Sequence, residues 1–218
     1  MSSPFFHEFE TLSLEMSTSL GNALVMADPH IGFELSRGLR IRTKFEEHLA
    51  EFIGEKDPDV LIVLGDLKEP LGLSFRLKEM LEGFFTAIRD TKVIITKGNH
   101  DGRIEEVAEG FSNVLVKNSF FIDGKLFLHG HTRLPAKEFD EVFLGHAHPA
   151  YTFRNDRVAK KTKVFVRTSR FLVLPSINPY IEGFDVREGL KLVPFLKNVR
   201  EVDVFLPQGI YMGRIKVY

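Results

Sequence analysis

The stretch VIITKGNHD, residues 93–101, sets a short apolar run directly against a cluster of polar side chains. The run VIIT is β-branched and bounded by polar residues, which is typical of a buried strand. The same arrangement occurs four more times: DPH (28–30) follows ALVMA (23–27), GD (65–66) follows VLIVL (60–64), HGH (129–131) follows KLFL (125–128), and GHAH (145–148) follows EVFL (141–144). Ligands of open α/β sheets bind beyond the carboxyl ends of the strands. We therefore expect these five clusters to converge on one point.

Two amphipathic stretches separate the first three apolar runs. Phe45, Leu49, Phe52 and Ile53 recur at helical spacing. A second helical stripe contains Phe75, Met80, Phe84 and Ile88, flanked by Leu77 and Leu81. Strand, helix, strand, helix, strand is the order that predicts a mainly parallel sheet with helices packed on it.

After about residue 112 the pattern changes to short strands and hairpin turns. Asp123-Gly124 separates SFFI from KLFL, and Asn155-Asp156 separates two further runs. Alternating residues in 201–218 predict strands that complete this second sheet or form its edge. Because no linker, repeat or low-complexity segment interrupts the 218 residues, we expect one domain, 1–218, with the second sheet packed against the first.

Composition narrows the chemistry of the site. The chain contains no cysteine, so disulfides and thiolate metal sites are excluded. Six of the eight histidines lie in the strand-end clusters, and only His7 and His48 lie outside them. The start of the chain does not resemble a secretory signal, and its apolar runs are too short to cross a bilayer. The formal net charge of −1 neither favours nor excludes nucleic acid. We expect a soluble cytoplasmic protein.

The spacing inside the clusters favours a metal site. Asp28 and His30 are two residues apart, as are His146 and His148, and such residues project to the same side of an extended chain. The glycines at 65, 98 and 145 precede ligand candidates and let the backbone turn sharply. Carboxylate, amide and imidazole donors without sulfur suit Mn²⁺, Fe or Zn²⁺.

The ordered set D-x-H (28–30), G-D (65–66), G-N-H-D (98–101), H-G (129–130) and G-H-x-H (145–148) resembles the calcineurin-like metallophosphoesterase superfamily. The stretch from GHAHP (145–149) through LPSINP (174–179) is similar to the SbcD-related archaeal phosphoesterases and the DNA-ligase-associated phosphoesterases. The resemblance implies a four-layer α-β-β-α sandwich with a dinuclear metal site. It also assigns the ligands: Asp28, His30 and His148 for the first ion, Asn99, His129 and His146 for the second, and Asp66 as the bridge.

The resemblance also implies catalytic roles. His100 matches the catalytic histidine of the family, and Asp101 would orient it. His131 has no ligand role in the motif, so we place it behind the ligands or near the substrate. A slip of two residues would exchange His131 with His129 as the ligand.

The implied reaction is hydrolysis of a phosphodiester, with a monoester as the alternative. Two divalent ions, Mn²⁺ foremost, can share a water and lower its pKa until hydroxide is available near neutral pH. Hydroxide then attacks phosphorus in line, and His100 donates a proton to the leaving oxygen. A carboxylate on the other ring nitrogen, here Asp101, would fix the tautomer of His100.

Other interpretations remain open at this point. Taken alone, each motif could simply be a turn sequence or, where it holds two histidines, a pair of histidines buried in the core. A metallo-β-lactamase-type centre needs H-x-H-x-D-H, but His148 is followed by Pro149-Ala150-Tyr151. A polymerase-histidinol-phosphatase-type centre needs a second histidine where Gly32 stands. A binding scaffold on the same fold, as in the retromer subunit, is a further alternative, although here His100 is present.

The substrate is less well defined by the sequence. Two stretches are basic: Arg37, Arg40, Arg42 and Lys44, and then 154–170 with Arg154, Arg157, Lys160, Lys161, Lys163, Arg167 and Arg170. They indicate either a surface that follows the phosphates of a nucleotide or nucleic acid, or, more simply, a solvated hairpin. The nearby aromatics Tyr151, Phe153, Phe165 and Phe171 are expected to face the core, so no stacking platform is evident.

Overall fold

The strands in the first half of the chain form a five-stranded sheet. A computed structural model describes residues 4–39, 41–154 and 159–217. The strands, in spatial order, are β1 (Leu14–Thr18), β2 (Gly21–Met26), β3 (Val60–Val63), β4 (Lys92–Thr96) and β5 (Val114–Lys117). Strands β2 to β5 are parallel, and β1 pairs with β2 antiparallel. The predicted parallel sheet is thus confirmed, while β1 was not expected.

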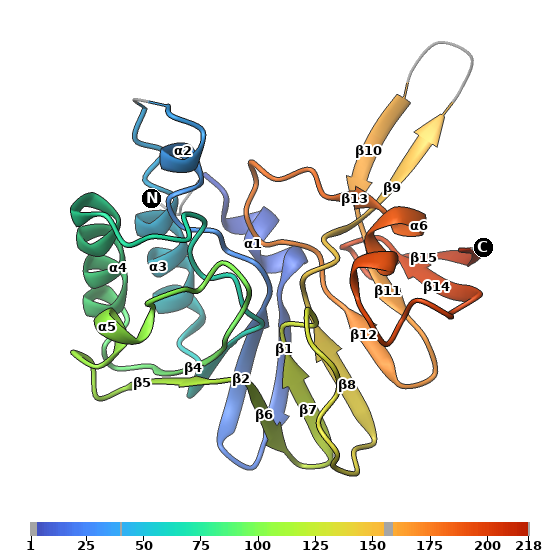
Figure 1. The fold of residues 1–218 in the computed structure, drawn as a ribbon, viewed down its shortest axis with the longest axis horizontal. Helices are drawn as coiled ribbons and strands as arrows, with labels where there is room; N and C mark the ends of the chain where they lie inside the picture. Colours follow the sequence, from blue (N-terminus) through green and yellow to red (C-terminus); the bar gives the residue numbers. More distant parts are fainter. Residues whose placement is uncertain (1–3, 40, 155–158, 218) are drawn as a thin grey trace.

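Helices cover the outer face of this sheet (Figure 1). They are α1 (Phe6–Leu12), α3 (Phe45–Lys56) and α4 (Phe75–Ala87), together with the single turns α2 (Phe33–Ser36) and α5 (Glu105–Ala108). The expected stripe of α3 is buried as predicted. The expected stripe of α4 is wrong at its start, because Phe75 is 78% exposed at the first turn and Leu77 is buried instead.

Most of the strands in the second half of the chain form a seven-stranded sheet. Its order is β15 (Tyr211–Lys216), β14 (Glu201–Phe205), β11 (Phe165–Arg167), β12 (Phe171–Val173), β8 (Glu141–Leu144), β7 (Lys125–Leu128) and β6 (Ser119–Ile122). Asp123 and Gly124, both at positive φ, form the predicted tight turn between β6 and β7. Strands β14 and β15 lie at one edge of the sheet, as the alternation in the last residues predicted.

The two sheets face each other across an apolar layer. Val25 of β2 and Ile62 of β3 lie on one side of it, opposite Phe127 of β7 and Phe143 of β8. The rings of Phe127 and Phe143 stack with centroids 5.0 Å apart. Behind the second sheet, α6 (Val186–Gly189) and the 3-10 helix η1 (Leu190–Leu192) contribute to another buried cluster. The four-layer α-β-β-α sandwich is confirmed.

A third, three-stranded sheet was not expected. Strand β9 (Pro149–Arg154) pairs with β10 (Ala159–Lys163) on one side and with β13 (Phe184–Asp185) on the other. The β9–β10 hairpin projects beyond the two larger sheets (Figure 1). Its predicted turn, Asn155-Asp156, lies outside the described residues. Among the described helices, none has the length and apolar character needed to cross a membrane.

The layer between the sheets generates a prediction about stability. Phe127 is fully buried and stacks on Phe143, so Phe127→Ala leaves a cavity and should lower the free energy of unfolding by about 3–5 kcal/mol. The exposed Phe75→Ala is the matched control and should change it by less than about 0.5 kcal/mol. Urea titrations of both variants measure the difference, and equal effects would contradict the assigned layer.

Candidate metal centre

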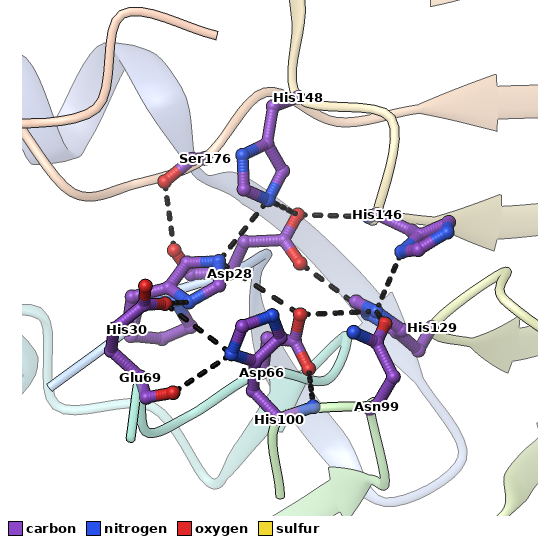
Figure 2. A network of polar contacts seen from close by, with 12 residues as sticks. Asp28, His30, Asp66, Glu69, Asn99, His100, His129, His146, His148 and Ser176 are labelled. Carbon is purple, nitrogen blue, oxygen red and sulfur yellow. Dashed lines mark hydrogen bonds and ion pairs between the residues drawn. The ribbon is translucent and has the colours of Figure 1, made fainter. Parts of the chain in front are cut away.

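The predicted ligands lie together at one edge of the two sheets. Strands β2, β3 and β4 are parallel neighbours in the first sheet, and β7 and β8 are parallel neighbours in the second. All five polar clusters follow the carboxyl ends of these strands. Figure 2 shows their side chains pointing toward one another. The expected convergence of the five clusters is therefore present in the structure.

Asp28, His30 and His148 form the first donor group. The Nε2 atoms of His30 and His148 are 3.2 Å apart, and Nε2 of His148 lies 3.5 Å from Oδ2 of Asp28. Nε2 of His30 also lies 3.9 Å from Oδ2 of Asp66, which connects this group to the second one.

Asp66, His129 and His146 form the second donor group. Nε2 of His129 lies 3.3 Å from Oδ2 of Asp66 and 3.0 Å from Nδ1 of His146. Oδ1 of Asn99 is also 3.0 Å from Nε2 of His129. The Asp66 carboxylate therefore lies between the two donor groups (Figure 2).

Outer contacts decide which ring nitrogens face inward. Nδ1 of His30 lies 2.6 Å from a carboxylate oxygen of Glu69, and Nδ1 of His129 lies 3.0 Å from the carbonyl oxygen of Leu64. Both partners are acceptors, so the proton of each ring, when neutral, is favoured on Nδ1, with the lone pair of Nε2 turned inward. Buried lone pairs and carboxylate oxygens gathered in this way favour a bound cation.

The charges at the site also favour a cation. Burial disfavours the imidazolium of His129, but the carboxylates of Asp66 and Asp28 outweigh it and raise the pKa of His129 to about 9. In His146, burial and repulsion from His129 lower the pKa to about 4, which keeps a lone pair available. Oδ1 of Asp28 is buried without a hydrogen-bond partner among the described residues. The donor set fits divalent ions such as Mn²⁺ or Zn²⁺.

The backbone of the site is strained. Asp28, His30, Asp66, His146 and His148 all have φ between 40° and 64°, the left-handed region that non-glycine residues rarely adopt. Each such residue costs about 1–3 kcal/mol and persists only where its surroundings hold it. Five of them in one cluster indicate a backbone shaped by the geometry of the site.

Gly65, Gly98 and Gly145 lie where any side chain would collide with a ligand candidate. Of the three, only Gly65 has a positive φ, yet the backbone also turns at the other two, where the N–H groups of Asp101 and Ala147 donate to the carbonyl oxygens of Gly98 and Gly145. A Cβ atom on Gly65 would overlap the ring of His129, and one on Gly98 would overlap the Asp66 carboxylate. On Gly145 it would overlap the carboxylate of Asp28. Each glycine thus makes room for a ligand candidate from another strand.

His100 lies beside the ligands, but its expected partner is elsewhere. Nδ1 of His100 donates to the carbonyl oxygen of Glu69 at 2.8 Å, and a Glu69 carboxylate oxygen lies 3.5 Å away. Asp101 is fully buried and accepts hydrogen bonds from the backbone N–H groups of Gly98 and Lys68. The prediction that Asp101 orients the imidazole is therefore wrong, because its carboxylate faces the loop backbone.

Asp101 instead helps to fix the loop that carries His100. Lys68 is also fully buried, and its ammonium donates to the carbonyl oxygens of His100, Pro70 and Leu71. The N–H of His100 donates to Oδ1 of Asp66 at 2.7 Å. The loop is therefore tied both to the bridging carboxylate candidate and to a buried charge.

Glu69 is the functional residue that the sequence analysis missed. Its carboxylate touches Nδ1 of His30 and approaches that of His100, and the hydrogen bond with His30 lowers the pKa of Glu69. The position three residues after Asp66, in the same strand-end loop, was the available signal. His131 lies with its ring 5.1 Å from that of His129 but outside the three donor groups of the described residues, the third of which is His30, Glu69 and His100.

The stretch LPSINP supports the loop that carries Asp28 and His30. Oγ of Ser176 donates to the carbonyl oxygen of Asp28 at 2.7 Å, and Nδ2 of Asn178 donates to that of Pro29 at 2.8 Å. The ammonium of Lys163 in turn donates to the carbonyl oxygens of Ser176 and Asn178. The stretch LPSINP thus lies against a ligand loop, and Lys163 of β10 holds it there.

Most cations of the basic stretches have partners inside the protein. Lys161 donates to the carbonyl oxygen of Gly183, Arg167 pairs with Glu141, and Arg170 contacts the carbonyl oxygen of Phe139. In the first stretch, Arg42 and Lys44 both pair with Glu47. Arg40 and Arg157 lie outside the described residues. Among the aromatics near the second stretch, Phe165 is buried, whereas Phe153 is 42% exposed, contrary to expectation.

The site opens into a cleft of about 450 Å³. His30, Asp66, Asn99, His146 and His148 line its inner end, with Glu69 and His100 beside them. A volume of this size is in the range of small-molecule sites, about 300–1,000 Å³. The ligand candidates are therefore accessible to a substrate.

Comparison with known proteins gives the class of this fold and site. Residues 22–164, more than half of the chain, match the model of the calcineurin-like phosphoesterase family. The chain belongs to this family and is a metal-dependent hydrolase of phosphoric esters. No curated protein matches its sequence.

One solved structure shows the same fold. The nuclease MPE of Pseudomonas putida is 20% identical, with a TM-score of 0.66 over 91% of this chain and 90% of that one. YfcE, a phosphoesterase from E. coli, is 14% identical, with a TM-score of 0.42 over 90% of this chain and 99% of that one.

The close approach of Asp66 to Gly98 leads to a prediction about metal binding. Gly98→Ala places a methyl group on the carboxylate and backbone nitrogen of Asp66, so we expect Mn²⁺ affinity to fall at least about tenfold and stability by about 1–3 kcal/mol. Calorimetric titration with Mn²⁺ measures the affinity. The matched control is Gly54→Ala in α3, whose added methyl meets open space and should leave Mn²⁺ affinity unchanged.

Lys163 generates a prediction about pH. Burial lowers the pKa of Lys163 to about 8, with Glu8 opposing it, whereas an unfolded lysine titrates near about 10.4. Between these values the unfolded chain binds more protons, so Lys163 makes the free energy of unfolding rise with pH, by about 2 kcal/mol from pH 8 to 10. Urea titrations should show this rise in wild type and in the exposed control Lys160→Met, and its loss in Lys163→Met. Equal slopes in both variants would contradict the assignment.

Proposed function

We propose that this chain is a dinuclear phosphodiesterase. Asp28, His30 and His148 would hold one divalent ion, Asn99, His129 and His146 the other, and Asp66 would bridge them. The observation that carries the proposal is the pair of donor groups joined by Asp66, with ring lone pairs facing inward. Mn²⁺ is the ion we favour for this nitrogen and oxygen donor set, with Zn²⁺ or Fe as alternatives.

The bound ions would supply Lewis acidity, which makes water ionise near neutral pH and stabilises negative charge on phosphoryl oxygens. The protein holds the ligands ready for them. Glu69 and the carbonyl of Leu64 keep the protons of His30 and His129 on the outer nitrogens, so that little reorganisation is needed when the ions bind.

His100 is the proposed proton donor. Its Nδ1–H is held by the carbonyl of Glu69, which leaves Nε2 for the leaving oxygen of a substrate in the cleft. A carboxylate oxygen of Glu69 lies 3.5 Å from the same Nδ1 atom, so both the carbonyl and the side chain of Glu69 face this edge of the ring. We therefore assign the orienting role to Glu69, while Asp101 and Lys68 position the loop from behind.

A diester fits the charges of the cleft better than a monoester. Arg37 is the one lysine or arginine among the described residues that line it, and Glu69 and Glu182 are also present. The dianion of a monoester would be stabilised by further cations, whereas the single negative charge of a diester needs fewer cations to balance it. The monoester remains the second candidate in the assay below.

Two comparisons favour a nucleotide or nucleic-acid ester as substrate. The stretch from GHAHP to LPSINP is similar to the SbcD-related and DNA-ligase-associated phosphoesterases, and we place the chain nearest to them as a single domain. The neighbour from Pseudomonas putida is a nuclease. A non-catalytic scaffold is the alternative of a different class.

The test separates metal binding from proton donation. We expect His100→Ala to keep its metal content and lose about 10² or more in turnover of bis-(p-nitrophenyl) phosphate. Asp66→Ala should lose metal, because its carboxylate serves both donor groups. Elemental analysis and initial rates with Mn²⁺, Zn²⁺ and Mg²⁺ measure the two effects.

The exposed His7→Ala is the control for removal of a histidine, and it should match wild type in both measurements. Full activity of His100→Ala would refute the assignment of the proton donor. Metal binding by the wild type without turnover of any mono-, di- or cyclic phosphate would support the scaffold instead.

A further inference from the structure

Three partly exposed aromatic residues line the cleft, and we call these three together its aromatic wall. Phe33 from α2, Tyr180 from the loop after LPSINP and Phe184 of β13 line the cleft together with the ligand candidates. Tyr180 is 41% exposed and Phe184 is 49% exposed. Large apolar side chains that gather at the mouth of a site are typical of a surface that binds a ligand. Nothing in the proposed hydrolysis uses these three rings.

The wall is fixed to the loops that carry the ligand candidates. The N–H of Phe184 donates to the carbonyl oxygen of His148 at 2.8 Å, and the N–H of Phe33 donates to that of His30 at 3.0 Å. The ring of Phe184 lies 6.2 Å from that of His148, tilted by 34°. A group held against this ring is therefore close to the first donor group.

Tyr180 is fixed in the same way through its backbone. Its N–H donates to Oδ1 of Asn178, whose amide in turn donates to the carbonyl of Pro29. The ring of Phe5 packs edge-on against Tyr180, with centroids 5.9 Å apart. The backbones of all three residues are thus held in place before any ligand arrives, which lowers the entropy lost on binding.

The chemistry of the wall suits a flat, π-rich group. The guanidinium of Arg37 lies 4.9 Å from the centroid of Phe33, which adds a positive, planar surface beside the rings. Aromatic and guanidinium planes stack on nucleobases, whatever the base. An aliphatic chain gains nothing from a cationic plane.

We propose that Phe33, Tyr180 and Phe184 form a base-stacking subsite, so that the substrate is a nucleoside phosphodiester. The base would lie against this aromatic wall while the phosphate meets the ligand cluster. The inference rests on the proposed function, because it assigns a substrate class to the same site. It also corrects the expectation that the chain has no stacking platform: the platform lies around residues 33 and 180–184, outside the basic stretch.

The subsite is expected to bind one nucleoside and not to follow a long strand. Lys161, Lys163, Arg167 and Arg170 of the basic stretch already have carbonyl or carboxylate partners inside the protein. Binding along a strand depends on cations that are available to neutralise phosphates. A dinucleotide should therefore be cleaved about as efficiently as a longer single strand.

The test compares two diesters with the same leaving group. Wild type should cleave thymidine 5′-(p-nitrophenyl phosphate) at least about tenfold more efficiently than methyl p-nitrophenyl phosphate. The double variant Tyr180→Ala/Phe184→Ala should lose this preference, measured as the ratio of its efficiencies on the two diesters. Phe184→Leu, which keeps apolar area without a ring, should lose part of the preference. Phe75→Ala, an exposed aromatic outside the cleft, should behave as wild type.

A binding measurement on metal-free protein gives an independent readout. In saturation-transfer NMR with excess chelator, the base protons of thymidine should receive signal from wild type and not from the double variant. No transfer to the base in wild type would overturn the subsite.

The outcomes separate the two proposals. If neither diester is cleaved with any metal, the proposed hydrolysis fails. If both are cleaved equally and the double variant changes nothing, the hydrolysis stands and the subsite is overturned. A single-stranded oligonucleotide cleaved more than about tenfold better than a dinucleotide would refute the restriction to one nucleoside.

Discussion

The crowding of electron-pair donors around Asp66 is the constraint on which the rest of the structure depends. Asp28 and Asp66 are almost fully buried, and imidazole nitrogens approach them with their lone pairs turned inward. Buried carboxylates are stable only when paired or when they coordinate a cation. Without an ion, His129 can meet this demand only in part, by holding a proton up to about pH 9.

Much of the surrounding chain serves to hold these donors against their mutual repulsion. Five ligand candidates adopt left-handed backbone conformations, and three glycines remove the side chains that would collide with them. Hydrogen bonds from Ser176 and Asn178 fix the first ligand loop, and buried Lys68 fixes the loop of His100. The strain of the site is balanced by packing and hydrogen bonds made farther out. The apolar layer between the two sheets keeps both sets of strand ends at the same edge.

The cleft that leads to the ligand candidates adds aromatic side chains to the site. Beside the ligands, the cleft is lined by rings from α2, the 180–183 loop and β13, while Lys161 and Lys163 of the hairpin β9–β10 donate to backbone carbonyl oxygens. Family membership establishes the hydrolysis of phosphoric esters. In our proposal, these rings recognise the group attached to the phosphate.

By itself the sequence determined the parallel strands β2, β3 and β4, the later strands β6, β7 and β8, and the polar clusters that follow five of them, whereas β1 and β5 were not expected. These features are local: apolar runs form strands, and their ends fall next to the D-x-H, G-D, G-N-H-D, H-G and G-H-x-H residues. Only the tertiary structure decided which atoms meet. It put Glu69 and not Asp101 at the ring of His100, His129 and not His131 in the donor group, and Tyr180 and Phe184 in the cleft. The physical reason is that side-chain direction within a loop depends on backbone turns and distant packing partners, which neither periodicity nor motif spacing records.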